Sequence, residues 1–345
     1  MSGIVRKIIK WGTISLVVMA LIPGTISLVK KIYLTLNPPP PPPPTVKYGK
    51  LPKLIFPEMS ASATPEYKLE TISGGLPAMA NVGNVYLVGV NKSRLLVLDR
   101  MTQKAKTVGL SRGPDELDER TYRYTSPSLP VDMIFDVITE SFSYKYDWTS
   151  DKSVYTVYDV PLKDSAEKEA KSFFQRMGVL QDDLVSGPVK MVYLTATSSA
   201  MFPANSPYEA NFVRVDLYRE DKDKIKFVTA GGDTSPINIT ISGQTGEKRI
   251  AQANYYYSQV IGDDYATYPL KSVETAWKEL ISGGGFIAKR STDNKAVIRR
   301  VYLGYYEANE QQSFIQPVYV FEGDGGFMAY TQAVDDAYVT DSPTK

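Results

Sequence analysis

Three segments of the chain repeat apolar residues at the spacing of an amphipathic helix. Residues that recur every three or four positions lie on one face of a helix. The segments between them carry short runs of β-branched and aromatic residues, which is typical of strands. The pattern predicts three helices, with apolar positions Leu98, Met101, Ala105 and Val108 in the first, Ala166, Ala170, Phe173 and Met177 in the second, and Val273, Ala276, Trp277, Leu280 and Ile281 in the third.

Two of these helices have recognisable start and stop residues. Asp164 precedes the second helix, with Glu167 as its capping-box partner, and Gly178 ends it. Ser272 is expected to be the N-cap of the third helix, which ends at Gly283. Short polar side chains accept hydrogen bonds from the first turn, and glycine adopts the left-handed conformation that closes a helix.

Strand-like runs precede and follow each helix. Extended stretches come before the helices, at Val85–Val90, Val154–Val160 and Ile250–Val260. Two sets of β-rich runs predict antiparallel hairpins, namely Val189–Thr197 with Asn211–Arg219, and Val297–Tyr306 with Pro317–Phe321 and Phe327–Ala333, the last two joined by a turn at Gly323–Gly326. Further strands are expected at Lys224–Val228, Ile237–Ser242 and Arg249–Val260, with a turn at Gly243–Gly246.

Two of the helix-and-strand units look duplicated. Pro161-Leu162-Lys163 and Pro269-Leu270-Lys271 precede the second and third helices, and Val192-Tyr193-Leu194 and Val301-Tyr302-Leu303 follow them in the same order. Two shared tripeptides at nearly the same offset indicate an internal repeat. One amphipathic helix on a short antiparallel sheet makes a two-layer unit.

The predicted fold class is therefore α+β, with two or three tandem lobes of one helix packed on an antiparallel sheet. The expected units are residues 58–160, residues 161–262 with extra strands, and residues 263–339, followed by a disordered tail at 340–345.

The N-terminal region contains an uncharged, mostly apolar stretch, Trp11–Val29. A membrane-spanning helix needs ~20 such residues, so residues 11–31 are predicted to be an uncleaved transmembrane anchor in the lipid bilayer. A buried core helix is the alternative. Three basic residues precede the stretch and two follow it, which predicts a cytoplasmic segment at 1–10 and an extracytoplasmic C-terminal region. The expected localisation is a cell membrane, crossed once.

Seven consecutive prolines at positions 38–44 lie in the expected linker, residues 32–57. Proline fixes φ and lacks an N–H, so the run favours a polyproline II spacer of about 22 Å. A docking motif for SH3-type or WW-type domains is the alternative interpretation.

The C-terminal unit reads YPLKSVETAWKEL, a glycine break, IRRVYLGYYE, QPVYVFEG and FMAYTQAV. This unit, roughly residues 268–334, resembles the PepSY-like lobes of YycH/YycI-type membrane-anchored regulators, with a fainter echo at Pro161–Tyr218. The resemblance implies a non-enzymatic protein that binds and restrains a membrane sensor kinase. The polyproline linker and the first unit depart from that pattern. The whole chain also resembles an uncharacterised anchored family of bacteria with small genomes.

Composition removes several classes of chemistry. The chain contains no Cys and no His, which excludes Ser-His-Asp and Cys-His catalysis and thiol redox chemistry. Lys and Arg number 39 against 38 Asp and Glu, so no overall basic field attracts nucleic acid. No cofactor is expected.

The remaining motifs for chemistry are weak. Ser165–Lys168 has the Ser-x-x-Lys spacing but lies in the first turn of a predicted helix, and Asp233-Thr234-Ser235 only approximates an aspartic-protease triplet. Gly283-Gly284-Gly285 is interpreted as a helix stop. Paired carboxylates are candidates for calcium, but none has EF-hand spacing; they are Asp221 with Asp223, Asp263 with Asp264, and Asp335 with Asp336. No catalytic residue and no metal ligand is predicted.

Tyrosine is abundant, with 24 residues. Alternation along strands places some of them in the core, and the others are candidates for an aromatic binding face. The candidate face consists of Tyr255, Tyr257, Tyr305, Tyr306 and Trp277.

The sequence thus predicts a membrane-anchored extracytoplasmic protein that acts by binding. We expect a non-enzymatic regulatory or scaffolding module of the cell envelope, whose partner is a sensor kinase or another envelope protein. The alternative is an envelope protein that binds a glycan or peptide on an aromatic sheet face. A hydrolase that works without His is a third class.

Overall fold

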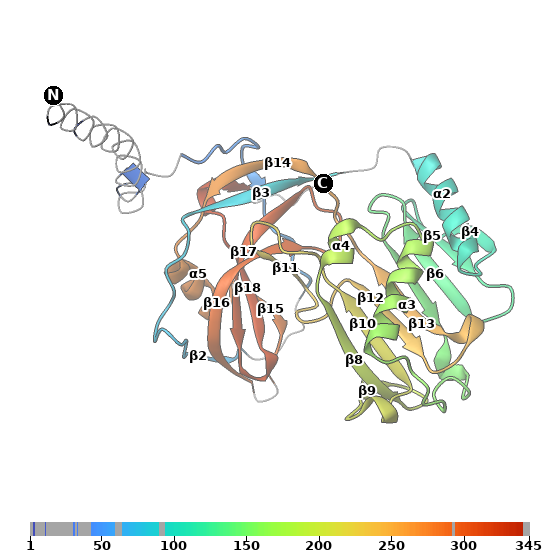
Figure 1. The fold of residues 1–345 in the computed structure, drawn as a ribbon. Helices are drawn as coiled ribbons and strands as arrows, with labels where there is room; N and C mark the ends of the chain where they lie inside the picture. The colour runs from blue at the N-terminus through green and yellow to red at the C-terminus, as the bar shows by residue number, and fades with distance from the viewer. Residues whose placement is uncertain are drawn as a thin grey trace. The chain divides into compact units, whose positions relative to one another are not determined.

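The computed structural model describes residues 43–58, 64–89, 94–291 and 294–340, and five single positions before residue 43. Residues 45–345 form one compact unit, and all elements discussed below lie in it. Its described part is dominated by strands, which assemble into two large sheets (Figure 1).

The first sheet has nine strands and is antiparallel throughout. Its strand order is β4 (Arg112–Glu116), β5 (Thr121–Thr125), β6 (Val131–Asp136), β7 (Phe142–Tyr146), β13 (Ile250–Tyr255), β12 (Ile237–Ser242), β10 (Phe212–Leu217), β8 (Val189–Ala196) and β9 (Met201–Pro203).

Three helices cover one face of this sheet, namely α2 (Arg94–Thr107), α3 (Lys163–Arg176) and α4 (Asp182–Ser186) (Figure 1). Each contributes apolar side chains to one shared core, including Met101, Phe173 and Leu184, which are at most 2% exposed. Alternate residues of β10 and β12 face these helices. Apolar residues therefore recur at every second position on the strands and about every 3.6 positions on the helices.

The second sheet has eight strands around β16 (Lys295–Glu307) and β17 (Phe314–Gly323). The other strands are β2 (Glu66–Leu69), β3 (Val82–Val88), β11 (Lys226–Thr229), β14 (Val260–Pro269), β15 (Phe286–Lys289) and β18 (Met328–Gln332). Helix α5 (Val273–Ile281) packs against β18. A separate parallel pair joins β1 (Leu51–Pro52) to β19 (Val339–Thr340). Five short 3₁₀ helices complete the described part, η1 (Trp148–Ser150), η2 (Pro207–Glu209), η3 (Gly246–Lys248), η4 (Asp324–Gly326) and η5 (Asp336–Tyr338).

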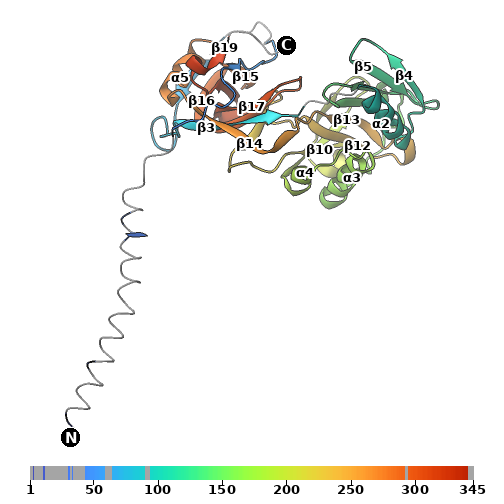
Figure 2. The same ribbon diagram turned by 90° about the horizontal axis from the view of Figure 1, so that it is seen from above.

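The predicted α+β fold of tandem lobes is wrong, because strands dominate and each sheet takes strands from distant parts of the chain. The eight-stranded sheet begins with β2 and β3, and the chain then supplies β4–β10 to the nine-stranded sheet. It returns for β11, leaves again for β12 and β13, and comes back at β14. Figure 2 shows the two sheets from above. Helix α5 does pack against the consecutive, antiparallel strands β15–β18, but these strands share one sheet with β2, β3, β11 and β14 from other parts of the chain.

Several local predictions are confirmed. Strand β8 pairs with β10, β16 pairs with β17, and β17 pairs with β18 across the expected glycine turn. The side chain of Ser272 caps α5, accepting a hydrogen bond from the Thr275 N–H at 3.2 Å. The Asp164 cap is wrong, because α3 already begins at Lys163 with Leu162 in the N-cap position. The predicted strand at Val154–Val160 is also absent, since these described residues form turns and irregular chain.

The prediction of a membrane-spanning helix also needs correction. Among the described residues, no helix is both long enough and apolar enough to cross a membrane. Residues 12–29 of the expected anchor and five of the seven prolines lie outside the described residues. The finding for the described residues contradicts the predicted single-pass membrane localisation.

A candidate binding groove

The nine-stranded sheet has two chemically different faces. On β12, Ile237, Ile239 and Ile241 belong to the core under the helices and are at most 1% exposed. The alternate residues Asn238 and Thr240 point to the opposite face. The sequence of β12 alternates apolar and polar residues as expected for such a strand. It therefore places polar groups along the face that the three helices do not cover, which is called the uncovered face below.

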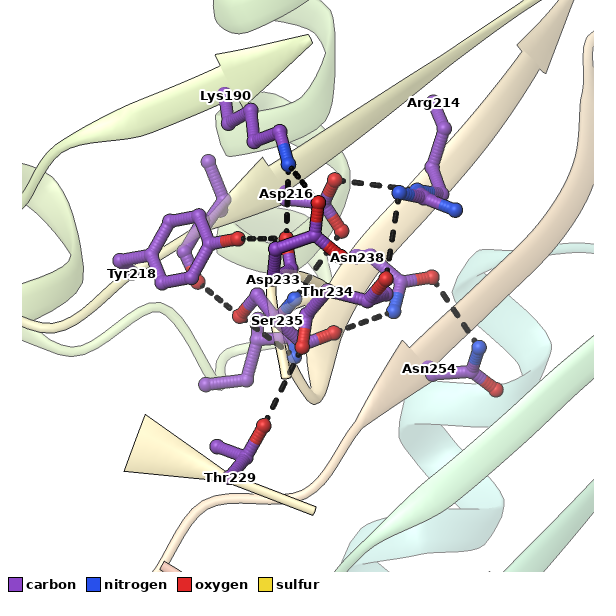
Figure 3. A network of polar contacts seen from close by, with 12 residues as sticks. Lys190, Arg214, Asp216, Tyr218, Thr229, Asp233, Thr234, Ser235, Asn238 and Asn254 are labelled. Atoms are coloured by element: carbon purple, nitrogen blue, oxygen red, sulfur yellow. Dashed lines mark hydrogen bonds and ion pairs between the residues drawn. The ribbon is translucent and has the colours of Figure 1, made fainter. Parts of the chain in front are cut away.

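Hydrogen bonds link these polar groups across neighbouring strands. Ser143 of β7 donates to the Asn254 Oδ1 of β13 at 2.9 Å. The Asn254 Nδ2 then donates to the Asn238 Oδ1 at 3.2 Å, and the Asn238 Nδ2 donates to the Ser235 carbonyl at 2.7 Å (Figure 3). We call Ser143, Asn254 and Asn238 the amide row. It follows the register of the sheet, because Ser143 pairs with Asn254 and Asn254 with Asn238.

One end of the amide row meets a cluster of charges around Asp233 (Figure 3). The Asp233 Oδ2 accepts from Lys190 of β8 at 2.8 Å and from Lys289 of β15 at 3.0 Å, so this carboxylate joins the two sheets. Tyr218 donates to the Asp233 carbonyl at 2.6 Å. Partial burial works to raise the pKa of Asp233, but hydrogen bonds from the two lysines outweigh it and lower the pKa.

The Asp233-Thr234-Ser235 motif therefore has a structural explanation. Thr234 accepts a hydrogen bond from the Arg214 guanidinium at 3.4 Å, and the Ser235 hydroxyl donates to the Leu217 carbonyl at 2.5 Å. These contacts fix the loop between β11 and β12 (Figure 3). The carboxylate that an acid–base mechanism would need is occupied by two ammonium groups.

A second connection between the sheets is a buried ion cluster on Arg219. Its guanidinium contacts the Asp183 carboxylate at 2.7 Å and the Glu307 carboxylate at 3.1 Å. It also lies between two rings, 4.1 Å from the Phe227 centroid and 4.3 Å from the Tyr257 centroid. Burial raises the pKa of Glu307, and the Arg219 charge opposes this shift. The buried ion pair between Arg219, just after β10, and Glu307, at the end of β16, holds the ends of these two strands together.

The other end of the amide row opens into a groove. We define the polar groove by two adjoining cavities of about 660 Å³ and 160 Å³, whose shared lining residues are Thr139, Ser141, Tyr256, Asn309, Glu310 and Gln311. The larger cavity also contains Ile134 and Ser143, which pair across β6 and β7. Its floor is thus the uncovered face of the nine-stranded sheet, and its opposite wall is the loop between β16 and β17.

The floor and walls of the polar groove differ in character. Ile134 is 37% exposed and supplies an apolar patch in the floor. Tyr256 is half-buried, and its pKa is raised by burial and by the nearby Asp136 charge. Asp136 itself is held by Arg120 at 2.5 Å. Within the described part of the chain, the hydroxyl of Tyr256 has no hydrogen-bond partner and is free for a ligand.

The structure distributes the tyrosines of the predicted aromatic face over several environments. Tyr255 is 5% exposed and stacks on Phe142 in the helix-covered core. Tyr257 belongs to the Arg219 cluster, and both residues also line the smaller cavity of the groove.

The remaining members of that predicted face lie elsewhere. Tyr305 and Tyr306 are at most 1% exposed and enter two different core clusters, because neighbouring residues of β16 point to opposite sides. Trp277 packs against Phe321, with ring centroids 5.7 Å apart. The structure therefore brings Tyr255 and Tyr257 together but not Tyr305, Tyr306 or Trp277.

Sequence reasoning missed the groove residues themselves. Tyr256 lies between Tyr255 and Tyr257 of the predicted face, and strand alternation is the signal that one of the three points the other way. The loop residues Asn309, Glu310 and Gln311 follow β16 with no motif to mark them. Their role depends on contact with strands β5–β7, which are far away in the sequence.

The paired carboxylates mostly have protein partners. Asp264 pairs with Lys47 at 2.5 Å, and Asp336 pairs with Lys271 at 2.9 Å. Asp335 caps η5, and Asp223 accepts from Tyr305 at 2.8 Å. A search of the described residues finds no group of three or more acidic side chains that would hold a metal ion.

Comparisons with known proteins add little to this geometry. No family model matches the chain, and no curated protein matches it. Its structure is similar to the crystal structure of an uncharacterized protein from Eubacterium rectale, over 77% of this chain and 81% of that chain, with 14% sequence identity and a TM-score of 0.38. The resemblance to PepSY-like regulators, and the sensor-kinase partner that it implies, stay predictions.

Proposed function

We propose that this protein is a non-enzymatic binding protein that holds its ligand in the polar groove. The observation that carries the proposal is the cavity of about 660 Å³ on the uncovered face of the nine-stranded sheet. Ligand-binding cavities typically measure ~300–1,000 Å³ and combine an apolar floor with a few polar groups. Ile134 and Tyr256 supply such a floor, and the loop at 309–311 supplies polar groups.

The support for binding rather than catalysis comes from the state of the charged groups. Of the two carboxylates that line the larger cavity, Asp136 is engaged by Arg120, so Glu310 has no second free carboxylate beside it in the described lining. Groups that transfer protons need free access to a substrate and a pKa near the working pH. Paired carboxylates whose hydrogen bonds are satisfied instead favour a fixed, preformed surface.

Rigidity around the groove supports the same function. The Arg219 cluster and the Asp233 cluster each connect the two sheets, and the Arg219 cluster adjoins the groove through Tyr257, which lines its smaller cavity. A preformed site loses less conformational entropy when a ligand binds. The scaffold thus suits recognition of one shape.

The test is a binding screen with the full chain and a variant that fills the groove. We expect members of a panel of oligosaccharides, short peptides and amino acids to raise the thermal unfolding midpoint of the wild-type protein. Ile134→Arg, which places a long charged side chain on the floor, is expected to abolish that shift. Ile281→Arg is the matched control, because Ile281 is similarly exposed, at 43%, on α5. Binding that survives in Ile134→Arg, or no shift with any member of the panel, would overturn the proposal.

A further inference from the structure

We infer that the ligand of the polar groove is a short neutral glycan whose sugar ring lies on Tyr256. This inference rests on the proposed function and names the class of ligand. Its basis is the combination of an aromatic ring, an aliphatic floor and uncharged amides in one cavity.

The floor matches the apolar side of a sugar ring. A pyranose presents C–H groups on one face, and such a face packs on aromatic and aliphatic side chains. Tyr256 and Ile134 both line the larger cavity, together with Ile55. The half-buried ring of Tyr256 is held at its backbone, where its N–H donates to the Pro236 carbonyl at 3.3 Å. The backbone that carries the ring would therefore lose little conformational freedom on contact.

The wall matches the hydroxyl groups of a sugar. Asn309 and Gln311 are exposed at the edge of the cavity, and among the described residues their side-chain amides have no hydrogen-bond partner. An amide both donates and accepts, and a sugar hydroxyl does the same. Neighbouring hydroxyls on a ring thus find complementary groups along the loop, and the free Tyr256 hydroxyl adds one more.

The charges of the cavity argue against an anionic ligand. Arg120 and Asp136 neutralise each other at 2.5 Å. Glu310 is the one charged residue lining the larger cavity that has no ion pair within the described part of the chain, and its sign would repel phosphate or carboxylate. A neutral ligand is therefore favoured over an acidic one.

The strand arrangement argues against an extended peptide. Peptides commonly bind by adding a strand to the free edge of a sheet. The floor is formed from β5, β6 and β7, and each of these strands already has a neighbour on both sides. Backbone groups in the floor are consequently engaged, and only side chains are left to recognise a ligand.

The experiment combines a glycan array with titration calorimetry of the full chain. We expect binding to neutral oligosaccharides and none to their sialylated or sulfated counterparts. Tyr256→Ala should weaken binding at least 10-fold, whereas Tyr256→Phe, which keeps the ring, should weaken it less than 5-fold. Tyr208→Ala is the matched control, since Tyr208 is 78% exposed on η2 and outside the groove. Asn309→Ala with Gln311→Ala should weaken binding without a change in the unfolding midpoint.

The outcomes separate this inference from the proposed function. If a peptide binds and Ile134→Arg abolishes its binding, the groove is a binding site but the glycan inference fails. If a neutral glycan binds equally well to Tyr256→Ala and to wild type, with both proteins folded by circular dichroism, the placement on Tyr256 is wrong. If no glycan, peptide or amino acid binds, both proposals fail.

Discussion

Strands β12 and β17 are both buried along almost their whole length, but they bury different groups on their second face. In β17, Val318 and Val320 enter one apolar cluster, and Tyr319 and Phe321 enter another. In β12, the isoleucines enter a core while Asn238 and Thr240 point to the other face, where Asn238 is hydrogen-bonded to Asn254 and to the Ser235 carbonyl. Both strands are central, so position in the sheet does not explain the difference.

The difference separates a structural sheet from one that offers a surface. The eight-stranded sheet uses both faces of β17 to hold its own layers together. The nine-stranded sheet needs only one face for its helices, and its second face is left to polar side chains that lead into the groove. Polar groups that are buried but mutually bonded define a fixed geometry at modest cost.

A polar residue on β17 should therefore be far more damaging than one on β12. Val320→Asn would place an amide among Val228, Val318 and Tyr330, in a cluster whose polar side-chain atoms are tyrosine hydroxyls that can satisfy only part of its hydrogen bonds. The loss of apolar burial and the unsatisfied amide together should lower the free energy of unfolding by about 3–5 kcal/mol. Equilibrium unfolding in urea measures this value. Thr240→Asn on β12 is the matched control and should lose less than half as much, so equal losses would break the comparison.

The sequence carries much of the local structure, because local structure depends on neighbouring residues. The periodicity around Phe173 and Trp277 predicts α3 and α5, and Ser272 caps α5 as expected. The paired runs that became β8 with β10 and β16 with β17 are also read directly from the pattern.

The arrangement of the sheets could not be read in the same way. Strand β2 pairs in parallel with the start of β16, more than two hundred residues later, and β11 pairs in parallel with the end of β16 along the same edge, opposite β17. Such pairings depend on long-range burial, for which a short strand like Glu66–Leu69 carries no local mark. An internal repeat suggested tandem lobes, whereas long-range pairing produced two interleaved sheets.

The candidate site was predictable only in part, because it depends on which side of the strand each tyrosine faces. In the triplet Tyr255-Tyr256-Tyr257 alternation predicts two orientations, but register alone decides which residue meets the core. The predicted face contains the outer two residues, but Tyr255 is in the core and Tyr256 lines the larger cavity. The loop that faces Tyr256 comes from the other sheet, which sequence spacing does not reveal.

The amide row provides a smaller test of the same comparison. Asn238→Ala removes the donor to the Ser235 carbonyl and the acceptor for Asn254. Leaving these buried groups unsatisfied should lower the free energy of unfolding by about 1–3 kcal/mol. The double variant with Asn254→Ala should lose less than the sum of the two single variants, because both contribute to one hydrogen bond. Strict additivity in urea unfolding would show that the row does not act as a connected unit.

The smallest expected effect concerns the crossover from β10 to β11, which links the two sheets at Asp223. Its carboxylate accepts hydrogen bonds from Asn84 at 2.9 Å and from Tyr305 at 2.8 Å, and it also contacts Tyr86. Burial works to raise the pKa of Asp223, but the bonds from Tyr86, Asn84 and Tyr305 outweigh it and lower the pKa.

Because the pKa of Asp223 is lower in the folded state than in the unfolded state, its contribution to stability depends on pH. The contribution is complete above the ordinary aspartate pKa of ~3.9 and is lost as the pH falls through the lower value of the folded state. Asp223→Asn cannot lose a charge, so its unfolding midpoint in urea should decline less steeply than that of wild type below about pH 4. Glu220→Gln is the control for a general charge effect. Glu220 is a nearby acidic residue, and its backbone N–H donates to the Asp183 carbonyl. Parallel declines in Asp223→Asn and wild type would show that the crossover is held by packing of the two tyrosines, as β17 is, rather than by its polar contacts.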